Sequence, residues 1–440
     1  MDLGKKIKYK IKIPLVDWLM RFSLKNNLPI LTALSLSLAA TKANRHSQYT
    51  VLCLGRSIFT NDIEALAHFG KKIKYLVINL KYFDFLLNHF ILAEDFKNIT
   101  ESNYHNANFG QAGKQNLNQY LKKVLPYWQR FSGFSAVMSG NFGYVQQQEL
   151  AKVCEAKRVP FIVLNKEGIA IPGAFEKYTE QYKNHHFFGA KMLLYNKQIK
   201  KALLTTKIAG LTEDKLKIVG VPRLDYYFFE RTNNNSANQK KITFFSFFPR
   251  DKFWYAIAND QELNQIENRS IEFHYWVMLF AQKYPEYQVI IKTKVAEHYV
   301  DYVSKILKER FNEPINNLKI INVGNPVELI KQAKVILGFN STTLLEAIAD
   351  DKLIITPYFG DIITGRNWDY FSDYPDLVNY AKTYEELENY LVSPNKYLNQ
   401  ENNKNKFLES YIFTPDGKSC QRTETEIIKT IRKPEFYETN

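Results

Sequence analysis

The chain has 440 residues, and its 59 Lys and Arg against 45 Asp and Glu give a formal net charge of +14. With 45% hydrophobic residues, 24% charged residues and only 15 Pro and 18 Gly, the composition excludes disordered, collagen-like and disulfide-scaffold proteins. At about 150 residues per domain, this length predicts two or three domains, each with its own core.

The positive charge is concentrated at the start of the chain. Residues 1–46 contain nine Lys or Arg against Asp2 and Asp17, which is half of the excess charge. We expect an anionic partner for this segment, namely the inner face of the cytoplasmic membrane, and no nucleic acid, because no recognition motif accompanies the charge. A solvated tail is the alternative, since residues 5–13 alternate basic and apolar residues like an edge strand.

Residues 28–40 (LPILTALSLSLAA) form the longest apolar stretch. The stretch is shorter than the roughly 18 to 20 residues that a membrane-spanning helix needs, and no convincing signal-peptide cleavage site follows it. We therefore expect a packed helix here, with a membrane-surface element as the alternative.

From residue 50 onward, short apolar runs alternate with amphipathic stretches. This alternation predicts parallel βαβ layers with helices on both faces of a sheet. In the first half we expect strands at 50–54, 74–79, 134–138, 160–164 and 217–220, and helices at 61–70, 144–157 and 196–209.

A polar stretch at residues 231–241 predicts a loop or linker, after which the same alternation resumes. The sequence contains no internal repeat. In the second half we expect strands at 241–245, 288–292, 318–321, 335–337 and 353–356, and helices at 271–283, 383–391 and 423–433.

The predicted fold class is therefore α/β, with two Rossmann-like doubly wound domains facing across a cleft. Ligands of such sheets bind at the carboxyl ends of the strands, at the topological switch points. The expected organisation is an N-terminal acceptor-side domain at 1–210, an interdomain seam at 211–240, a C-terminal nucleotide-donor domain at 241–410, and a helical tail at 411–440.

The most informative stretch is 335–358 (VILGFNSTTLLEAIADDKLIITPY), which reads as strand, turn, helix and strand. Ser341 is a good N-cap, and the backbone N–H groups and hydroxyls of Thr342 and Thr343 favour a bound phosphate. Glu346, one turn further along, suits ribose hydroxyls. The alternative is a helix that is merely capped, because Thr343 and Glu346 have the spacing of a capping box.

Two Rossmann-like halves with G-x-N-S-T-T-x-x-E in the second, starting at Gly338 and including Asn340, resemble GT-B glycosyltransferases of the bacterial surface-polysaccharide type. Residues 164–168 (LNKEG) and 220–225 (GVPRLD) resemble motifs of surface-carbohydrate proteins, including the retaining β-Kdo transferases that use CMP-Kdo. Residues 414–422 are similar to the D-G-x-x-x-x-R element of these proteins and of polyglycerol-phosphate polymerases.

The resemblance implies a glycosyltransferase that moves a sugar, expected to be Kdo from CMP-Kdo with retention, onto a lipopolysaccharide or capsule glycan or glycolipid. It also implies a carboxylate nucleophile, for which Asp225 is the candidate, with Arg223 nearby to keep it ionised. Glu167 is the candidate acid/base. The alternatives are a turn or helix cap for Asp225 and a surface loop acid for Glu167.

Further basic residues are candidates for the donor's charge. Many of these transferases carry Lys-x-His-Pro after a second-domain strand, whereas this chain has Lys292-Thr293-Lys294-Val295. We expect Lys292 and Lys294, with Arg223 and Arg250, to contact the donor. A solvated strand end and a loop salt bridge are the alternatives for Lys294 and Arg250.

No metal and no cofactor are expected beyond the nucleotide sugar. Cys53, Cys154 and Cys420 are far apart in the sequence, and no His, Cys or acidic cluster has metal-ligand spacing, so a reducing cytoplasm is expected. Two other functions remain as alternatives: a polyol-phosphate transferase that uses CDP-glycerol or CDP-ribitol, and a noncatalytic basic module at a membrane surface.

Overall fold

The computed structural model describes residues 3–44, 47–56, 58–106, 108–171, 174–229, 240–246, 254, 257–397 and 401–433, and for residues 3–12, 401 and 402 it describes the backbone alone. The chain divides into two compact units. Unit 1 comprises Met1–Ile169, Ala174–Asp225 and Tyr411–Asn440, and unit 2 comprises Ala170–Gly173 and Tyr226–Ser410.

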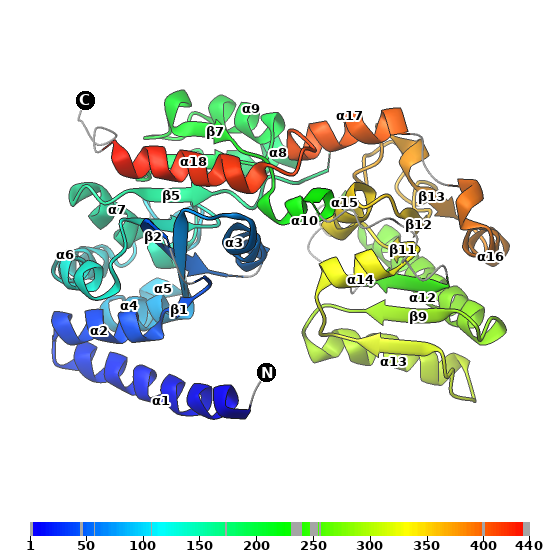
Figure 1. The fold of residues 1–440 in the computed structure, drawn as a ribbon, viewed down its shortest axis with the longest axis horizontal. Coiled ribbons are helices and arrows are strands. Elements are labelled where there is room, and N and C mark those ends of the chain that lie inside the picture. The colour runs from blue at the N-terminus through cyan, green and yellow to red at the C-terminus, as the bar shows by residue number, and fades with distance from the viewer. Residues whose placement is uncertain are drawn as a thin grey trace. The chain divides into compact units, whose positions relative to one another are not determined.

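Unit 1 contains a seven-stranded sheet, counted over the described residues, with the strand order β1-β3-β2-β4-β5-β6-β7 (Figure 1). All neighbouring strands are parallel except β1, which pairs antiparallel with β3. The strands are β1 Thr41–Lys42, β2 Tyr49–Gly55, β3 Ile73–Asn79, β4 Ala136–Ser139, β5 Phe161–Leu164, β6 Lys191–Leu194 and β7 Leu216–Ile218.

The central strands β4, β5 and β6 are buried at every position, as expected for parallel strands with helices on both faces. The helices of this unit are α1 Leu3–Lys25, α2 Pro29–Ala39, α3 Ile58–Phe69, α4 Lys81–Phe90, α5 Ala93–Phe96, α6 Gln111–Ser132, α7 Gln148–Ala156, α8 Ala174–Glu180, α9 Lys197–Thr206 and α18 Ser419–Arg432. Short 3₁₀ turns lie at η1 Val145–Gln147, η2 Glu213–Lys215 and η3 Pro222–Leu224.

Leu3–Lys25 form the helix α1, so the strand-like reading of residues 5–13 is wrong. The alternative of a solvated tail is not tested, because the side chains of residues 3–12 lie outside the described ones. The alternation of basic and apolar residues at 5–13 lies within α1. Further along α1, the buried residues Val16, Met20 and Leu24 follow helical spacing. The packing of this face outweighs the strand-like local pattern.

Unit 2 contains a six-stranded parallel sheet among the described residues, with the order β10-β9-β8-β11-β12-β13. Its strands are β8 Lys241–Phe245, β9 Gln288–Lys292, β10 Leu318–Ile321, β11 Val335–Gly338, β12 Leu353–Pro357 and β13 Asn379–Ala381. Its helices are α12 Asp260–Lys283, α13 Glu297–Arg310, α14 Pro326–Gln332, α15 Thr342–Ala349, α16 Tyr384–Val392 and most of α17 Glu401–Ile412, with 3₁₀ turns η5 Pro375–Leu377 and η6 Pro394–Tyr397.

The boundary between the units lies inside α10 (Asp225–Phe229), within the expected seam. Residues 411–440 belong to unit 1, although they follow unit 2 in the sequence. Most of the expected linker at 231–241 lies outside the described residues. Within the described part of the chain, no helix has both the length and the apolar character needed to cross a membrane.

Candidate functional site

Over the described strands, each sheet has one topological switch point. In unit 1 the chain passes from β2 to β3 on one side and to β4 on the other, and in unit 2 it passes from β8 to β9 and later to β11. Doubly wound sheets bind ligands outside the carboxyl ends of the strands that flank such a point. The carboxyl ends of β2 and β4, and those of β8 and β11, are therefore where function is expected.

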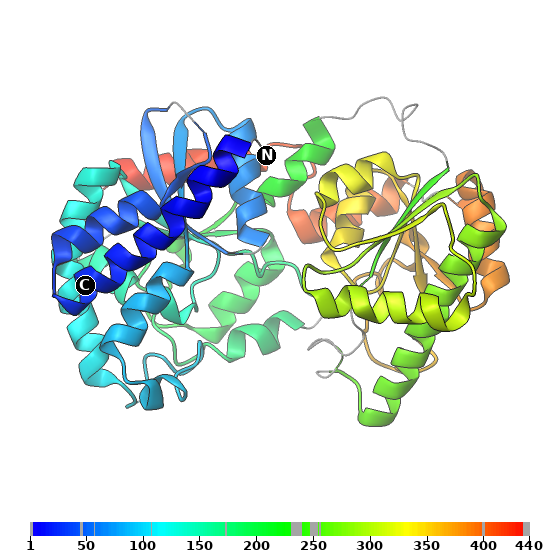
Figure 2. The ribbon, with the colours of Figure 1, turned by 90° about the horizontal axis from the view of Figure 1, so that it is seen from below.

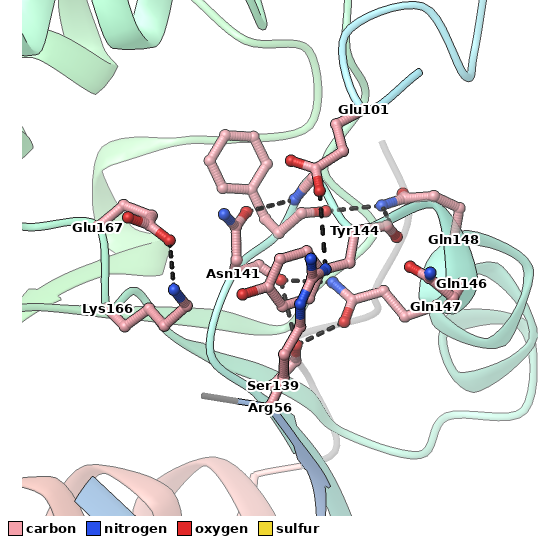
Figure 3. Close-up of polar contacts among 12 residues, drawn as sticks. Arg56, Glu101, Ser139, Asn141, Tyr144, Gln146, Gln147, Gln148, Lys166 and Glu167 are labelled. Atoms are coloured by element: carbon pink, nitrogen blue, oxygen red, sulfur yellow. Dashed lines mark hydrogen bonds and ion pairs between the residues drawn. The ribbon is translucent and has the colours of Figure 1, made fainter. Parts of the chain in front are cut away.

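The loop after β4 is held rigidly by its own side chains. Gln147 Nε2 donates to the carbonyl of Asn141 at 2.5 Å, and the Gly143 N–H donates to Asn141 Oδ1 at 2.7 Å (Figure 3). Gln148 Nε2 donates to the Phe142 carbonyl at 2.7 Å. The loop therefore presents Tyr144 from a fixed backbone.

Charged side chains surround Tyr144. Arg56, which follows β2, lies with its guanidinium carbon 4.4 Å from the centre of the Tyr144 ring, and its Nη1 is 3.9 Å from Glu101 Oε1 (Figure 3). Tyr182 donates a hydrogen bond of 3.2 Å to Glu101 Oε2. Burial raises the pKa of Tyr144, and so does the Glu167 carboxylate, although the cations of Lys166 and Arg56 oppose the shift.

Glu167 follows β5 at the same edge of the sheet. Its Oε1 lies 2.5 Å from Lys166 Nζ, and its side chain is 38% exposed, whereas that of Lys166 is 10% exposed. Burial alone would lower the pKa of Lys166, but the Glu167 carboxylate and the Tyr144 phenol outweigh it and raise that pKa. Glu167 is therefore an accessible carboxylate with a fixed cation beside it.

A buried amide lies directly before this pair. Among the described residues, neither polar atom of the fully buried Asn165 side chain has a hydrogen-bond partner. Leaving such a group unpaired costs about 1–3 kcal/mol. His185 is also buried and packs against Phe142 with ring centres 5.6 Å apart.

In unit 2, Ser341 follows β11 and caps α15. Its hydroxyl accepts from the Thr343 N–H at 3.3 Å and lies 2.9 Å from the Thr343 hydroxyl. The N–H of Thr342 is at the first position of the helix, where no intrahelical acceptor exists. Asn340 Oδ1 is a buried acceptor without a partner in the described part of the chain. These groups occupy the carboxyl end of β11, beside β8.

The other candidates for the donor site in unit 2 are Glu346, Lys292, Lys294 and Arg250. Glu346 is 8% exposed, and its Oε2 accepts a 3.0 Å hydrogen bond from Tyr227. Lys292 donates to the carbonyls of Thr293 at 2.6 Å and Asn322 at 3.0 Å, and burial lowers its pKa. Lys294 is exposed, with Nζ 5.6 Å from the centre of the Tyr299 ring. Arg250 lies outside the described residues.

Asp225 has a helix-capping environment. Its Oδ1 and Oδ2 accept from the N–H groups of Ser419 and Cys420 at 3.1 and 2.7 Å, at the start of α18, and its side chain is 1% exposed. Arg223 is also buried, and its Nη1 lies 3.3 Å from both carboxylate oxygens of Asp62 and 3.0 Å from the Tyr195 hydroxyl. The structure thus places both Asp225 and Arg223 at buried positions of unit 1, and their predicted catalytic and donor-binding roles stay predictions.

The two motifs that contain Asp225 and Arg422 meet at Ser419, the first residue of α18. Arg422 binds both oxygens of Asp416, at 2.9 and 2.8 Å, and its Nε donates to the Val219 carbonyl at 2.9 Å. Gly220 has φ +86°, and a Cβ there would lie 2.5 Å from Ser419 Oγ. These residues fix α18 to the turn after β7.

Among the predicted residues, the structure brings together Asn340 to Thr343 and Glu346 on one strand-turn-helix segment. Arg223 pairs with Asp62, and Asp225 caps α18. Arg56, Glu101 and Tyr144 were not predicted, although Arg56 follows a glycine at a strand end. No group of three or more His, Cys, Asp or Glu side chains that could hold a metal ion occurs within the ranges described above.

The comparisons with known proteins show a similarity of fold. No protein-family model and no curated protein matches the chain. A putative UDP-N-acetylglucosamine 2-epimerase from Listeria monocytogenes superposes with a TM-score of 0.51 and 8% identity, over 88% of this chain and 97% of that one. A second UDP-N-acetylglucosamine 2-epimerase gives 0.50 and 10%, over 87% and 96%. A glycosyltransferase from Rickettsia africae gives 0.45 and 15%, over 88% and 100%.

At these identities the likeness concerns the fold. The first two structures have TM-scores of 0.51 and 0.50 and extend over nearly the whole of both chains. The predicted α/β fold of two Rossmann-like domains, of the GT-B type, is confirmed.

Proposed function

We propose that this chain is a glycosyltransferase that moves a sugar from a nucleotide donor to an acceptor glycan or glycolipid. The observation that carries the proposal is the pair of polar sites at the carboxyl ends of the strands, one in each sheet. One site has a helix N-terminus with hydroxyl groups, and the other has an accessible carboxylate among cations. Sugar transfer needs both a binding site for the leaving nucleotide and an acid/base for the acceptor hydroxyl.

The donor half of the proposal rests on the start of α15. A nucleotide phosphate there would be met by the Thr342 N–H, the hydroxyls of Ser341 and Thr343, and the positive end of the helix dipole. The unpaired Asn340 oxygen supports a ligand that brings its own donor group, such as a ribose hydroxyl or a base amine. The carboxylate of Glu346, one turn further along α15, would contact the ribose hydroxyls.

The acceptor half rests on Glu167 and Glu101. A carboxylate at either position takes the proton from the acceptor hydroxyl as that oxygen attacks the anomeric carbon. Lys166 holds the Glu167 carboxylate in place, and Arg56 lies beside Glu101. The ionic groups of the acceptor glycan would meet Arg56, whose side chain is half exposed.

The finer form of the proposal follows the resemblance: the donor is CMP-Kdo, the acceptor belongs to lipopolysaccharide or capsule, and configuration is retained. Retention requires a carboxylate to displace CMP and form a glycosyl ester. The acceptor hydroxyl then attacks the anomeric carbon of that ester and releases the carboxylate. Asp225 would have to give up two hydrogen bonds to attack. Mass spectrometry of peptides after mixing with CMP-Kdo should therefore locate the added sugar, and an enzyme that turns over without an adduct favours inversion.

The first experiment measures thermal stabilisation by CMP, CDP, UDP and GDP. A ligand at about 100 times its dissociation constant raises stability by about 2.7 kcal/mol. Stabilisation by CMP that Ser341→Ala abolishes supports the donor site. Thr383→Ala, which removes the equivalent cap of α16, is the matched control and should leave CMP binding unchanged. A preference for CDP favours a polyol-phosphate transferase, and no response to any nucleotide contradicts the proposal.

A further inference from the structure

Helix α2 is apolar on its exposed side. Ile30, Leu34 and Leu38 follow each other at intervals of four residues and are each at least 39% exposed. The opposite side of the helix is buried and includes Thr32 and Leu36. A surface helix of a soluble protein normally turns charged or polar residues to water, but α2 contains no charged residue.

Helix α1 shows the same feature beside α2. Leu15, Trp18 and Phe22 lie on one face and are 52%, 58% and 42% exposed, with the Trp18 and Phe22 rings stacked at 5.3 Å between centres. Over the described side chains of α1, the opposite face is buried at Val16, Met20 and Leu24. Figures 1 and 2 show α1 lying along the outer side of α2 in unit 1, so the two exposed apolar faces belong to neighbouring helices.

The third helix, α6, packs against α2 and forms a groove with it. The groove has a volume of about 620 Å³ and is lined mainly by apolar groups, among them Leu28, Leu34, Pro126 and Tyr127. Lys122 and Lys123 also line it. Phe131 of α6 is a further exposed aromatic residue.

Almost all charged residues of these three helices are basic. In the sequence, α1 contains seven Lys or Arg and α6 contains four, whereas Asp17 is the single acidic residue of the three helices. Arg21 and Lys25 of α1 and Lys123 and Arg130 of α6 are exposed. Basic side chains therefore accompany an apolar surface with almost no acidic residues among them.

We infer that α1, α2 and α6 form a surface that docks on an anionic lipid bilayer. Amphipathic helices that lie in a bilayer surface place aromatic and aliphatic side chains among the acyl chains and basic side chains among the headgroups. A second copy of this chain fits poorly, because two such surfaces facing each other would bring like charges together. The groove between α2 and α6 suits an acyl chain, with Lys122 and Lys123 available for a phosphate.

This inference is independent of the proposed function, because vesicle binding is measured without donor or acceptor. The full chain is mixed with phosphatidylcholine vesicles that either contain or lack phosphatidylglycerol, and the bound fraction is measured by sedimentation. We expect binding to the anionic vesicles that falls at least tenfold when salt is raised from low to physiological ionic strength, because salt shortens electrostatic reach to about 8 Å. No binding at low salt overturns the inference.

Variants separate the apolar part from the electrostatic part. Trp18→Ser with Leu34→Ser, and separately Lys122→Glu with Lys123→Glu, should each reduce anionic-vesicle binding at least tenfold. The matched controls are Leu92→Ser, which changes another exposed leucine of unit 1, and Lys308→Glu with Lys319→Glu, which changes two exposed lysines of unit 2; both should bind as the native chain does. Equal losses in test and control variants would contradict the inference.

Insertion of the exposed aromatic side chains into the bilayer can be measured separately, by tryptophan fluorescence. Trp18 is 58% exposed, whereas Trp128, Trp254 and Trp368 are buried. Vesicles with chain-brominated lipids should therefore quench the native fluorescence, and Trp18→Phe should lose most of that quenching. Vesicle binding without any quenching would show adsorption by charge alone and would contradict docking through the apolar faces. If the Ser variants change only the oligomeric state, and not vesicle binding, the surface is a contact between copies.

Discussion

Asp225 and Glu167 are both carboxylates of unit 1, but their surroundings differ. Asp225 is buried and accepts two backbone hydrogen bonds, and burial raises its pKa although those N–H groups act to lower it. Glu167 is partly exposed beside Lys166 at the carboxyl edge of the sheet. Proton transfer to or from a substrate needs an accessible group, so Glu167 is the better candidate for acid/base chemistry.

The first prediction concerns Glu167. Glu167→Gln keeps the side-chain shape but removes the base, so turnover should fall by roughly 100- to 10,000-fold while CMP affinity stays unchanged. The matched control is Glu180→Gln, which removes the same partner from the exposed Lys183–Glu180 pair at 2.8 Å. The measurement is steady-state transfer with calorimetric titration of CMP. Full activity in Glu167→Gln would remove Glu167 from the mechanism.

His274 of α12 provides a second residue-scale prediction. It is fully buried, and its Nε2 lies 2.7 Å from Ser246 Oγ. Burial lowers its pKa from 6.5 to about 4. The folded state therefore holds the neutral ring while the unfolded chain takes up a proton, so this contribution to stability is present above pH 6.5 and is lost as the pH falls towards about 4.

A shift of that size corresponds to about 3 kcal/mol. His274→Gln cannot titrate, so the native chain should lose up to that much more unfolding free energy than the variant between pH 7 and pH 4. Denaturant unfolding at a series of pH values measures the difference. Burial also lowers the pKa values of His105 and His185. Both residues are present in the native chain and in the variant, so their contributions cancel in the comparison. Parallel pH profiles would show that His274 is not held neutral.

At the scale of elements, α18 depends on contacts that its own sequence does not reveal. Its N-terminal N–H groups are capped by Asp225, which precedes it by nearly 200 residues, and Arg422 ties it to the Val219 carbonyl. Glu424 Oε1 also accepts from the Ile73 N–H at 3.2 Å. A segment that follows unit 2 in the sequence is thus an integral part of unit 1.

The third prediction tests this arrangement. Asp225→Ala should lower the unfolding free energy of unit 1 by about 2–4 kcal/mol, because it leaves two buried N–H groups without acceptors. Arg422→Ala should cost about 1–3 kcal/mol. The two losses should not add, since both release the same helix. If Asp225 acts only as a cap, activity per folded molecule survives in Asp225→Ala; if it is also the nucleophile, activity collapses even under conditions where the variant is folded.

Much of the element order could be predicted because parallel strands buried on both faces give short apolar runs. The predicted strands at 241–245, 288–292 and 318–321 coincide with β8, β9 and β10. β6 was not predicted, because KMLL is too short to distinguish a strand from a helix. β1 was not predicted because its antiparallel pairing with β3 depends on tertiary contact.

The site was predictable only where local chemistry marks it. Ser341 follows a strand and precedes a helix, and that pattern alone predicts the cap that the structure contains. The association of Arg56 with Tyr144 joins residues almost 90 positions apart, and no local pattern indicates it. The burial of Arg223 depends on Asp62, again far away in the sequence. Long-range pairing therefore limits what the sequence can reveal about the site.

At the scale of the whole molecule, each candidate site is built from residues of one unit. Asn340 to Glu346 and Tyr227 belong to unit 2, whereas Arg56, Glu101, Tyr144 and Glu167 belong to unit 1. The assignment of nucleotide binding to unit 2 and of acid/base chemistry to unit 1 is therefore testable. A nucleotide that binds the start of α15 stabilises the unit that holds this helix, by an amount that its concentration sets.

The last prediction uses that assignment. With CMP at about 100 times its dissociation constant, hydrogen exchange in unit 2 peptides from β11 and α15 should report opening free energies raised by about 2.7 kcal/mol. Peptides from β4 and β5 of unit 1 should change little if the two units open independently. Exchange measured by mass spectrometry with and without CMP gives both values in one sample, and Ser341→Ala is the internal control in which the unit 2 effect should vanish. Equal protection of both units would show that they open together. Protection confined to unit 1 would place the nucleotide on the unit 1 sheet and would contradict the assignment of α15 to the donor site.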